Sequence, residues 1–304
     1  MSWRRILGVT LLVGVTWSGG GGSVAVADAG ASADGAPTRV LFLGDSITGS
    51  PGCWRADVWT AITDAGHDVD MVGIRDLDEC GGVRNAAGEP WDPEHAGIAG
   101  ATTAAMFVRI ARDGLIKETA PDVVVMLLGT NDLWGRQSAE AVLPQFQLLL
   151  EAIRADAPEA AVIVGTVPPL AANACAECQP QIDAVNAGLP AWAESASTAA
   201  SPVTLVAVHE GFDAEADTYD GAHPDDSGDA KLAAAFTPAL LAVLDGGSSQ
   251  GDPSDDGQLG DAAGEDPATA RGSIPWPFLL VTLLAVVTGA VVGGRRRRRT
   301  RAAP

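Results

Sequence analysis

The stretch VVVMLLGTND at residues 123–132 decides the fold, because a continuous apolar run ends there in a polar turn. A strand without polar alternation is covered on both faces, as the strands of a parallel sheet are. Four further runs rich in β-branched and apolar residues lie before and after it in the chain. They cover residues 39–43, 68–72, 161–165 and 203–207.

Helical patterns separate these strand candidates. They lie near residues 55–65, 102–112, 139–157 and 181–199, with a last one at 227–244 that Ser227 is expected to cap. The alternation predicts an α/β domain with a doubly wound, five-stranded parallel sheet, helices on both faces and right-handed crossovers. In such a fold the ligand site lies beyond the carboxyl ends of the strands.

Three polar motifs fall at those carboxyl ends. Gly44-Asp45-Ser46 follows the first strand directly and would present a hydroxyl on a tight turn, where a base can reach it. Gly100 precedes a helix and could leave its N–H pointing into the site. Asn131 could aim its side-chain amide at a developing oxyanion. Taken singly, the first two motifs are better explained as ordinary turns, and the third is equally well explained as one.

A fourth motif, Asp220-Gly-Ala-His223, follows the fifth strand. Imidazole titrates near neutral pH and suits the base that an attacking serine needs. The spacing of three lets Asp220 orient the ring and stabilise the imidazolium. The other histidines of the domain, His67, His95 and His209, are interpreted as surface or structural residues, although His95 could line a substrate cleft. The joint placement of all four motifs favours a catalytic site.

The four motifs follow one another along the chain in the order Ser, Gly, Asn, Asp-x-x-His. With this order the chain resembles the SGNH/GDSL hydrolase family over nearly all of residues 39–244. The resemblance implies a flavodoxin-like strand order and a carboxylic ester hydrolase that needs no metal or organic cofactor. It implies Ser46 as nucleophile, His223 as base and Asp220 as the residue that orients the base. It also implies an oxyanion hole made by the N–H groups of Ser46 and Gly100 and the amide of Asn131.

A narrower resemblance covers residues 44–102. The stretches GDSIT at 44–48, AGHDVDMVG at 65–73 and HAGIAG at 95–100 are similar to the acetylxylan-esterase branch of the carbohydrate esterases. The chain departs from that branch at Ala96, where glutamate is usual, and in a cysteine-bearing insertion near 78–84. We therefore expect O-deacetylation of a carbohydrate. The substrate-binding candidates are Asp45, Arg55, His95 and Asp132.

Four cysteines lie in the part of the chain that is predicted to be exported, and an even count in an oxidising compartment suggests disulfides. We favour the pairs Cys53–Cys80 and Cys175–Cys178, because the first two cysteines follow the first two strands. Zinc bound by Cys175 and Cys178 is the alternative. No second His/Cys pair with ligand spacing accompanies them, so no metal site is expected.

The two ends of the chain have the composition of targeting and anchoring segments. Residues 1–27 contain Arg4 and Arg5, a short apolar run and a cleavage motif of small residues that ends at Ala27. This combination predicts a signal peptide. An uncleaved anchor is the alternative, but the apolar run is too short to span a bilayer. The uncharged residues 274–294 can cross a hydrocarbon core of about 30 Å.

The arginines that follow this span place the tail in the cytoplasm and the main domain outside the cell. The expected organisation is a signal peptide (1–27), a hydrolase domain (37–245), a flexible linker (246–273), a transmembrane helix (274–294) and a basic tail (295–304).

The formal net charge is −20, and every acidic residue lies between the two ends. So acidic a surface argues against nucleic acid as a partner. The expected partners are an ester substrate, either a small molecule or a polysaccharide, and the membrane through the C-terminal helix. Two alternatives remain: a lipase-like or thioesterase-like hydrolase of small acyl esters, and a non-catalytic cell-surface binding domain. Aromatic residues, 5% of the chain, offer few stacking platforms for sugars and do not decide between them.

Overall fold

The computed structural model describes residues 35–246. Along the chain the elements are β1 (Thr38–Gly44), α1 (Ser46–Gly49), α2 (Trp54–Asp64), β2 (Val69–Met71), β3 (Ala96–Gly97), α3 (Thr103–Ala111), α4 (Leu115–Thr119), β4 (Val123–Leu127), α5 (Thr130–Trp134), α6 (Ala139–Asp156), β5 (Ala161–Gly165), α7 (Ala172–Cys175), α8 (Gln179–Ala196), β6 (Val203–Val206) and α9 (Asp226–Leu244). The predicted signal peptide, transmembrane helix and basic tail, and all but the first residue of the predicted linker, lie outside the described residues.

The strands form one parallel sheet in the order β2-β1-β4-β5-β6. This order and the helices on both faces confirm the predicted doubly wound α/β fold. The sheet also has a short strand that the sequence did not indicate, β3, which pairs with the end of β1. A strand of two residues is too short to show any hydrophobic period.

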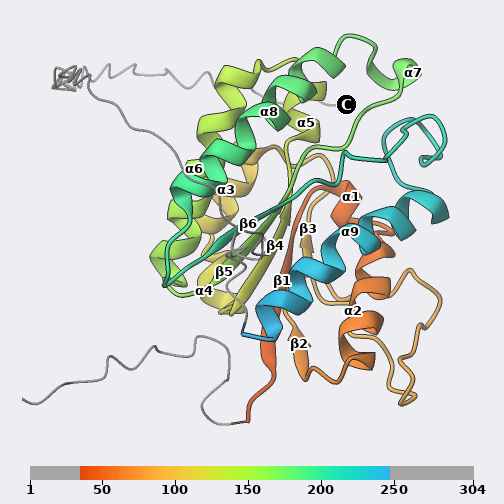
Figure 1. The fold of residues 1–304 in the computed structure, drawn as a ribbon, viewed down its shortest axis with the longest axis vertical. Coiled ribbons are helices and arrows are strands. Elements are labelled where there is room, and N and C mark those ends of the chain that lie inside the picture. Colours follow the sequence, from red (N-terminus) through yellow and green to blue (C-terminus); the bar gives the residue numbers. More distant parts are fainter. Residues whose placement is uncertain (1–34, 247–304) are drawn as a thin grey trace, which may run out of the picture. The chain divides into compact units, whose positions relative to one another are not determined.

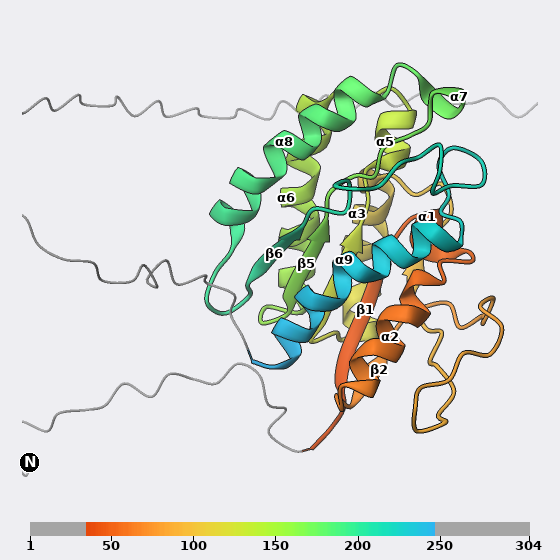
Figure 2. The same cartoon turned by 45° about the vertical axis from the view of Figure 1, so that its right-hand side comes forward.

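The β strands are covered on both faces, as their continuous apolar runs predict (Figures 1 and 2). In β1, Val40 and Phe42 pack on the side of α2 and α9. Leu41 and Leu43 pack on the side of α3, α6 and α8. Successive side chains of a strand point to opposite faces, and all four of these are completely buried.

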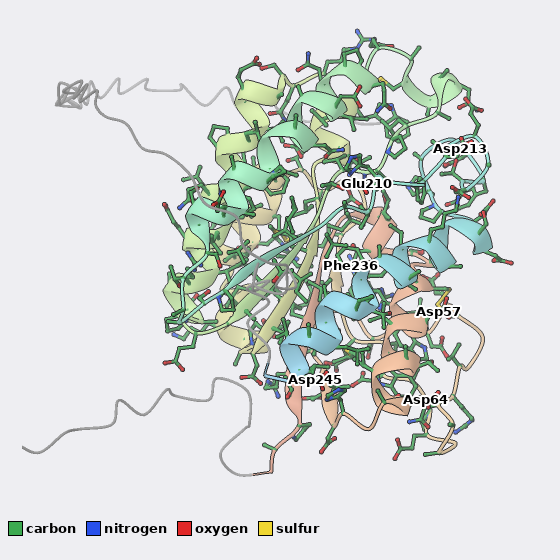
Figure 3. All side chains as sticks on the ribbon, in the orientation of Figure 1. Asp57, Asp64, Glu210, Asp213, Phe236 and Asp245 are labelled. Atoms are coloured by element: carbon green, nitrogen blue, oxygen red, sulfur yellow. A yellow bond between two sulfur atoms is a disulfide. The ribbon has the colours of Figure 1, made fainter. Side chains whose placement is uncertain are left out.

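An aromatic cluster fixes α2 and α9 on their face of the sheet. The ring of Trp54 stacks on Phe236 at 4.9 Å between centroids and meets Phe42 edge-on at 5.2 Å. Phe236 lies between α9 and the strands (Figure 3). The indole Nε1 of Trp54 donates a hydrogen bond of 2.9 Å to the carbonyl of Ile47 in α1. This hydrogen bond connects the aromatic cluster of the core to α1, the short helix that begins at Ser46.

Helix α9 is the one helix in residues 35–246 that is long and apolar enough to cross a membrane. Its side chains Leu232, Phe236 and Leu240 are completely buried in the core of the domain. It is therefore a helix of the folded domain and is distinct from the predicted span at residues 274–294.

The N-cap of α9 is Asp225 rather than the predicted Ser227. The carboxylate of Asp225 accepts the backbone N–H groups of Ser227 and Gly228, at 2.9 and 3.1 Å. Both residue types are good N-caps, and only the backbone conformation decides between neighbours.

Four short helices, α1, α4, α5 and α7, were not predicted. Each has four or five residues, which is too few to display the helical period. Two of them matter for the site, because Ser46 and Asn131 lie in α1 and α5 rather than in loops.

Two disulfides join Cys53 to Cys80 and Cys175 to Cys178, which is the pairing favoured from the sequence. The sulfur atoms of the second pair are bonded to each other. They are therefore not the free thiolates that a zinc site would require.

The packing of α9 on β5 predicts that adding one methyl group at Gly165 destabilises the fold. A Cβ on Gly165 would lie 2.7 Å from Cζ of Phe236 and 2.9 Å from Cδ1 of Leu127. We expect Gly165→Ala to lower the free energy of unfolding by about 1–3 kcal/mol in urea titrations, because the core has no room for the group. Phe236→Leu in the same chain should relieve part of this clash. Strictly additive losses in the double variant would contradict the prediction.

Candidate active site

The fold brings together the three residues that the sequence assigned to a catalytic triad. Ser46 begins α1, and His223 lies in the loop between β6 and α9, yet Oγ of Ser46 and Nε2 of His223 are 2.9 Å apart. The other ring nitrogen, Nδ1, lies 2.7 Å from Oδ2 of Asp220. Hydroxyl, imidazole and carboxylate thus form one continuous line of contacts, which is the arrangement expected of a catalytic triad.

The carboxylate of Asp220 is held by more than the imidazole. Its Oδ1 accepts the backbone N–H groups of His223 at 2.8 Å and of Ala222 at 3.0 Å. Burial acts to raise the pKa of the Asp220 carboxyl, but these hydrogen bonds outweigh burial and keep the pKa below its ordinary value. Asp220 therefore stays ionised around neutral pH and can stabilise an imidazolium.

The turn that presents Ser46 depends on a glycine and an aspartate. A Cβ on Gly44 would lie 2.1 Å from Oγ1 of Thr48 and 2.6 Å from the carbonyl oxygen of Leu127, so no larger residue fits. Asp45 caps α1, with its Oδ1 accepting the N–H of Ile47 at 2.9 Å. Gly44 and Asp45 thus fix the turn that presents the Ser46 hydroxyl.

The expected oxyanion donors lie at the same edge of the sheet. Gly100 is exposed and has a φ of +73°, and a Cβ there would meet no atom within 4 Å. Its left-handed backbone, and not lack of space, is what favours glycine. Nδ2 of Asn131 donates to Oδ2 of Asp45 and to the carbonyl of Ala101, both at 3.1 Å. Both amide hydrogens thus have partners within the protein.

The four substrate-binding candidates lie beneath the site rather than in it. They are almost fully buried, with exposed fractions of 1% for Asp45, 1% for Arg55, 2% for His95 and 0% for Asp132. Their polar atoms are engaged by neighbouring loops. This placement gives them a supporting role in the structure, and their contact with substrate stays a prediction.

Asp132 and Arg55 show this support most clearly. Asp132 accepts the N–H of Thr103 at 2.9 Å and its hydroxyl at 2.7 Å, which ties α5 to the start of α3. Arg55 donates to the carbonyls of Thr48 and Pro93, at 2.6 and 3.2 Å, and so ties the end of α1 to the segment before β3. Its guanidinium also lies over the Trp91 ring.

Asp45 and His95 have pKa values far from their ordinary range. Burial raises the pKa of the Asp45 carboxyl to about 7, against the hydrogen bond from Ile47 and the charge of His223. Burial, assisted by the charges of Arg55 and Arg75, lowers the pKa of His95 to about 3. His95 is therefore neutral, and its Nδ1 accepts the N–H of Gly97 at 2.9 Å.

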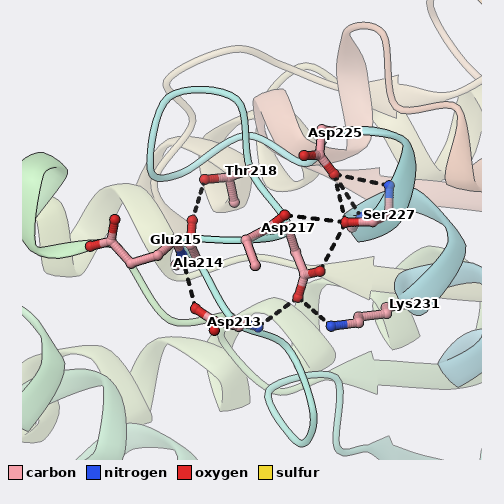
Figure 4. A network of polar contacts seen from close by, with 10 residues as sticks. Asp213, Ala214, Glu215, Asp217, Thr218, Asp225, Ser227 and Lys231 are labelled. Carbon is pink, nitrogen blue, oxygen red and sulfur yellow. Dashed lines mark hydrogen bonds and ion pairs between the residues drawn. The ribbon is translucent and has the colours of Figure 1, made fainter.

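A buried carboxylate that the sequence did not single out organises the loop that carries Asp220 and His223. Asp217 is 2% exposed, and its Oδ2 accepts the N–H of Asp213 at 2.7 Å and the ammonium of Lys231 at 2.5 Å. Its Oδ1 accepts the hydroxyl of Ser227 at 2.9 Å (Figure 4). The sequence signal that could have indicated this ion pair is Lys231, because it is one of only two lysines in an acidic chain.

Neither of two hollows in the described surface is lined by Ser46, Asp220 or His223. The larger, of about 290 Å³, lies between residues 169–172 and 212–215. It adjoins the triad loop, because the N–H of Ala171 donates to the carbonyl of Gly221 at 2.8 Å. The other, of about 220 Å³, lies at the end of α5 and is lined by Leu133 and Arg136 among others.

The fold and this site define an ester-hydrolysing serine hydrolase. The chain belongs to the GDSL-like Lipase/Acylhydrolase family, whose model matches residues 42–231. The non-catalytic alternative is therefore set aside. A search of curated proteins finds no match.

Three solved structures resemble the chain closely enough to be informative. A carbohydrate esterase family 3 protein from Talaromyces cellulolyticus is 32% identical, with a TM-score of 0.61, and the match covers 68% of this chain and 98% of that one. A serine-to-alanine mutant of an acetyl esterase with an acetate ion is also 32% identical, with a TM-score of 0.60 and the same coverage. A Clostridium thermocellum family 3 carbohydrate esterase is 25% identical, with a TM-score of 0.55 and again 68% and 98% coverage.

The Asp217 contacts predict a loss of activity from a change that does not touch the triad. Asp217→Asn keeps the shape of the side chain but removes the charge that pairs with Lys231. We expect kcat/KM for a short acyl ester to fall about 10- to 100-fold, because the loop would no longer hold His223 in place. The control is Glu210→Gln, an exposed acid on the same loop (Figure 3). Equal activity in both variants would contradict the prediction.

The lowered pKa of His95 predicts a specific dependence of stability on pH. In the unfolded chain His95 takes up a proton near pH 6.5, but in the folded state only near pH 3. Between these values the unfolded state binds the extra proton, so the free energy of unfolding falls as pH is lowered. His95→Asn keeps an acceptor for Gly97 without titrating. We expect this variant to lose about 2 kcal/mol less than wild type between pH 7 and pH 5.

Urea titrations at several pH values measure this difference. Contributions from the raised pKa values of Asp45 and Asp229 have the opposite slope, but they are common to both chains and cancel in the comparison. Parallel stability profiles for the two chains would show that His95 titrates normally in the fold.

Proposed function

We propose that the chain is a secreted, membrane-anchored serine esterase that removes acetyl groups from a carbohydrate. One observation carries the proposal: Ser46, His223 and Asp220 form a continuous chain of hydrogen bonds, at 2.9 and 2.7 Å, at the carboxyl edge of the sheet. Ser46 is the nucleophile and His223 is the general base. Asp220 orients the imidazole of His223 and stabilises its protonated form.

The reaction is acyl transfer in two steps. Nε2 of His223 takes the hydroxyl proton while Oγ of Ser46 bonds to the ester carbonyl carbon, whose π electrons move to the oxygen. The imidazolium then gives this proton to the leaving alcohol oxygen as the carbon–oxygen bond breaks. Water, deprotonated by the same histidine, attacks the carbonyl carbon of the acyl-enzyme. The bond from this carbon to Oγ of Ser46 then breaks, and the imidazolium returns the proton to Oγ as the acid is released.

The proposed oxyanion donors are the N–H groups of Ser46 and Gly100 and Nδ2 of Asn131. Since both hydrogens of Nδ2 have protein partners, one must turn to the oxyanion. The hydrogen bond that remains keeps the Asn131 amide attached to the protein.

The similar structures support the choice of an acetyl ester. Two of them are a carbohydrate esterase and an acetyl esterase with acetate. Each is 32% identical to this chain, and the match covers 98% of its length. The sequence resemblance of residues 44–102 to acetylxylan esterases points the same way.

The cellular arrangement rests on the composition of the two ends. We propose a signal peptide at 1–27, a hydrolase domain at 37–245, a linker at 246–273, a single membrane span at 274–294 and a cytoplasmic tail at 295–304. Helix α9 ends at Leu244, which supports a domain boundary near residue 245. The catalytic domain then faces the outside of the cell.

Acetate release from acetylated polysaccharides and from short nitrophenyl esters tests the proposal on the full chain in detergent. We expect Ser46→Ala to lower kcat/KM about 10³-fold or more and Asn131→Ala about 10²–10³-fold. Ser195→Ala, an exposed serine on α8, is the control and should match wild type. Acetyl esters should be turned over faster than octanoyl esters.

Different results would refute the assignment of the nucleophile and the choice of substrate. Undiminished turnover in Ser46→Ala would refute the assignment of the nucleophile. Faster turnover of octanoyl than of acetyl esters, with no acetate released from any polysaccharide, would instead favour the lipase-like alternative.

A further inference from the structure

Tyr219 stands out as an exposed aromatic side chain in contact with the triad. Among the exposed large hydrophobic side chains of residues 35–246, two are aromatic, Trp134 at 38% and Tyr219 at 62% exposure. The ring of Tyr219 stacks on the imidazole of His223, with 5.7 Å between centroids and 15° between planes. Tyr219 is the one tyrosine of the chain.

The local backbone holds this ring in place. The N–H of Tyr219 donates to the carbonyl of His223 at 3.1 Å, and the neighbouring Thr218 pairs with Pro224 in a short antiparallel bridge. Both residues thus lie at the base of the narrow turn that carries Asp220. The position of the aromatic ring beside the imidazole is set by the turn itself.

The core does not account for Tyr219, because most of its side chain is in contact with solvent. Orientation of the imidazole is already supplied by the Asp220 carboxylate, which binds both Nδ1 and the backbone N–H of His223. A large exposed aromatic surface next to a reactive site is typical of a binding contact.

The reaction chemistry specifies which half of the substrate reaches this ring. In acyl transfer the carbonyl oxygen turns to the amide donors, and the leaving oxygen turns to Nε2 of His223, which gives it a proton. The carbon skeleton of the leaving alcohol therefore lies beside the imidazole, where the ring of Tyr219 is stacked. The acyl group lies away from this side.

We infer that Tyr219 is a specificity-determining residue that binds the carbohydrate leaving group. The inference rests on the proposed function and adds which side chain recognises the sugar. A pyranose ring presents a face of C–H groups, and this face packs on the flat, partly negative face of an aromatic ring. The Tyr219 ring offers its exposed surface for that contact while its other side covers His223.

Two esters with the same acetyl group and different alcohols test the inference on the full chain: an acetylated xylo-oligosaccharide and methyl acetate. We expect Tyr219→Leu to lower kcat/KM for the oligosaccharide about three- to tenfold, mainly through KM. Methyl acetate, which has no ring to stack, should change less than about twofold. Tyr219→Phe keeps the ring and should restore the oligosaccharide activity.

Trp134→Leu serves as the matched control, because it removes the other exposed aromatic ring without touching His223. It should leave the ratio of the two activities at the wild-type value. An equal loss in Trp134→Leu would overturn the assignment to Tyr219.

The pH profile of methyl acetate hydrolysis separates binding from positioning. If Tyr219 acted by holding the imidazole, Tyr219→Leu would lower both activities equally and shift the profile, which would overturn the inference. Unchanged kcat/KM for both esters would also overturn it. A wild-type enzyme that hydrolyses methyl acetate but no acetylated oligosaccharide would instead refute the proposed substrate.

Discussion

The site depends on one buried carboxylate. Residues 207–225, between β6 and α9, contain no helix and no named strand, yet they must hold His223 within reach of Ser46. A buried charge costs several kcal/mol unless it is paired and hydrogen-bonded. Asp217 meets this condition with Lys231 and Ser227 of α9 and with the N–H of Asp213. The loop is therefore attached to a helix, and the helix is attached to the sheet.

Aromatic side chains attach α9 to the sheet, and the same cluster supports the short helix that begins at Ser46. Phe236 of α9 stacks on Trp54 of α2, and the indole of Trp54 binds the carbonyl of Ile47, next to the serine. The two halves of the site, which are far apart in the chain, thus rest on one rigid cluster. Buried polar residues complete the support: Arg55 fixes the end of α1, and Asp132 fixes α5. The half-buried Ser46 and His223 and the exposed Asp220 lie above this buried framework.

The sequence predicted the fold well, because the signals for a parallel sheet are local. Five apolar runs became β1, β2, β4, β5 and β6, and the main helices begin and end within two or three residues of their predicted bounds. The errors have physical causes. Strand β3 and the four short helices are too short for a hydrophobic period. A further feature that no sequence pattern reveals is the burial of the candidates Asp45, Arg55, His95 and Asp132.

What the sequence determined by itself is the type of sheet and the chemistry at its carboxyl edge, because apolar runs and the motifs that follow them are contiguous in the chain. The sequence also predicted that Ser46 and His223, which are 177 positions apart, meet at this edge. Only the tertiary structure decided the other contacts of the site. The pairing of Asp217 with Lys231 and the stacking of Tyr219 on His223 depend on how one loop folds. Such contacts depend on which polar side chains of two segments come together, and a hydrophobic pattern shows only which face of each segment is buried.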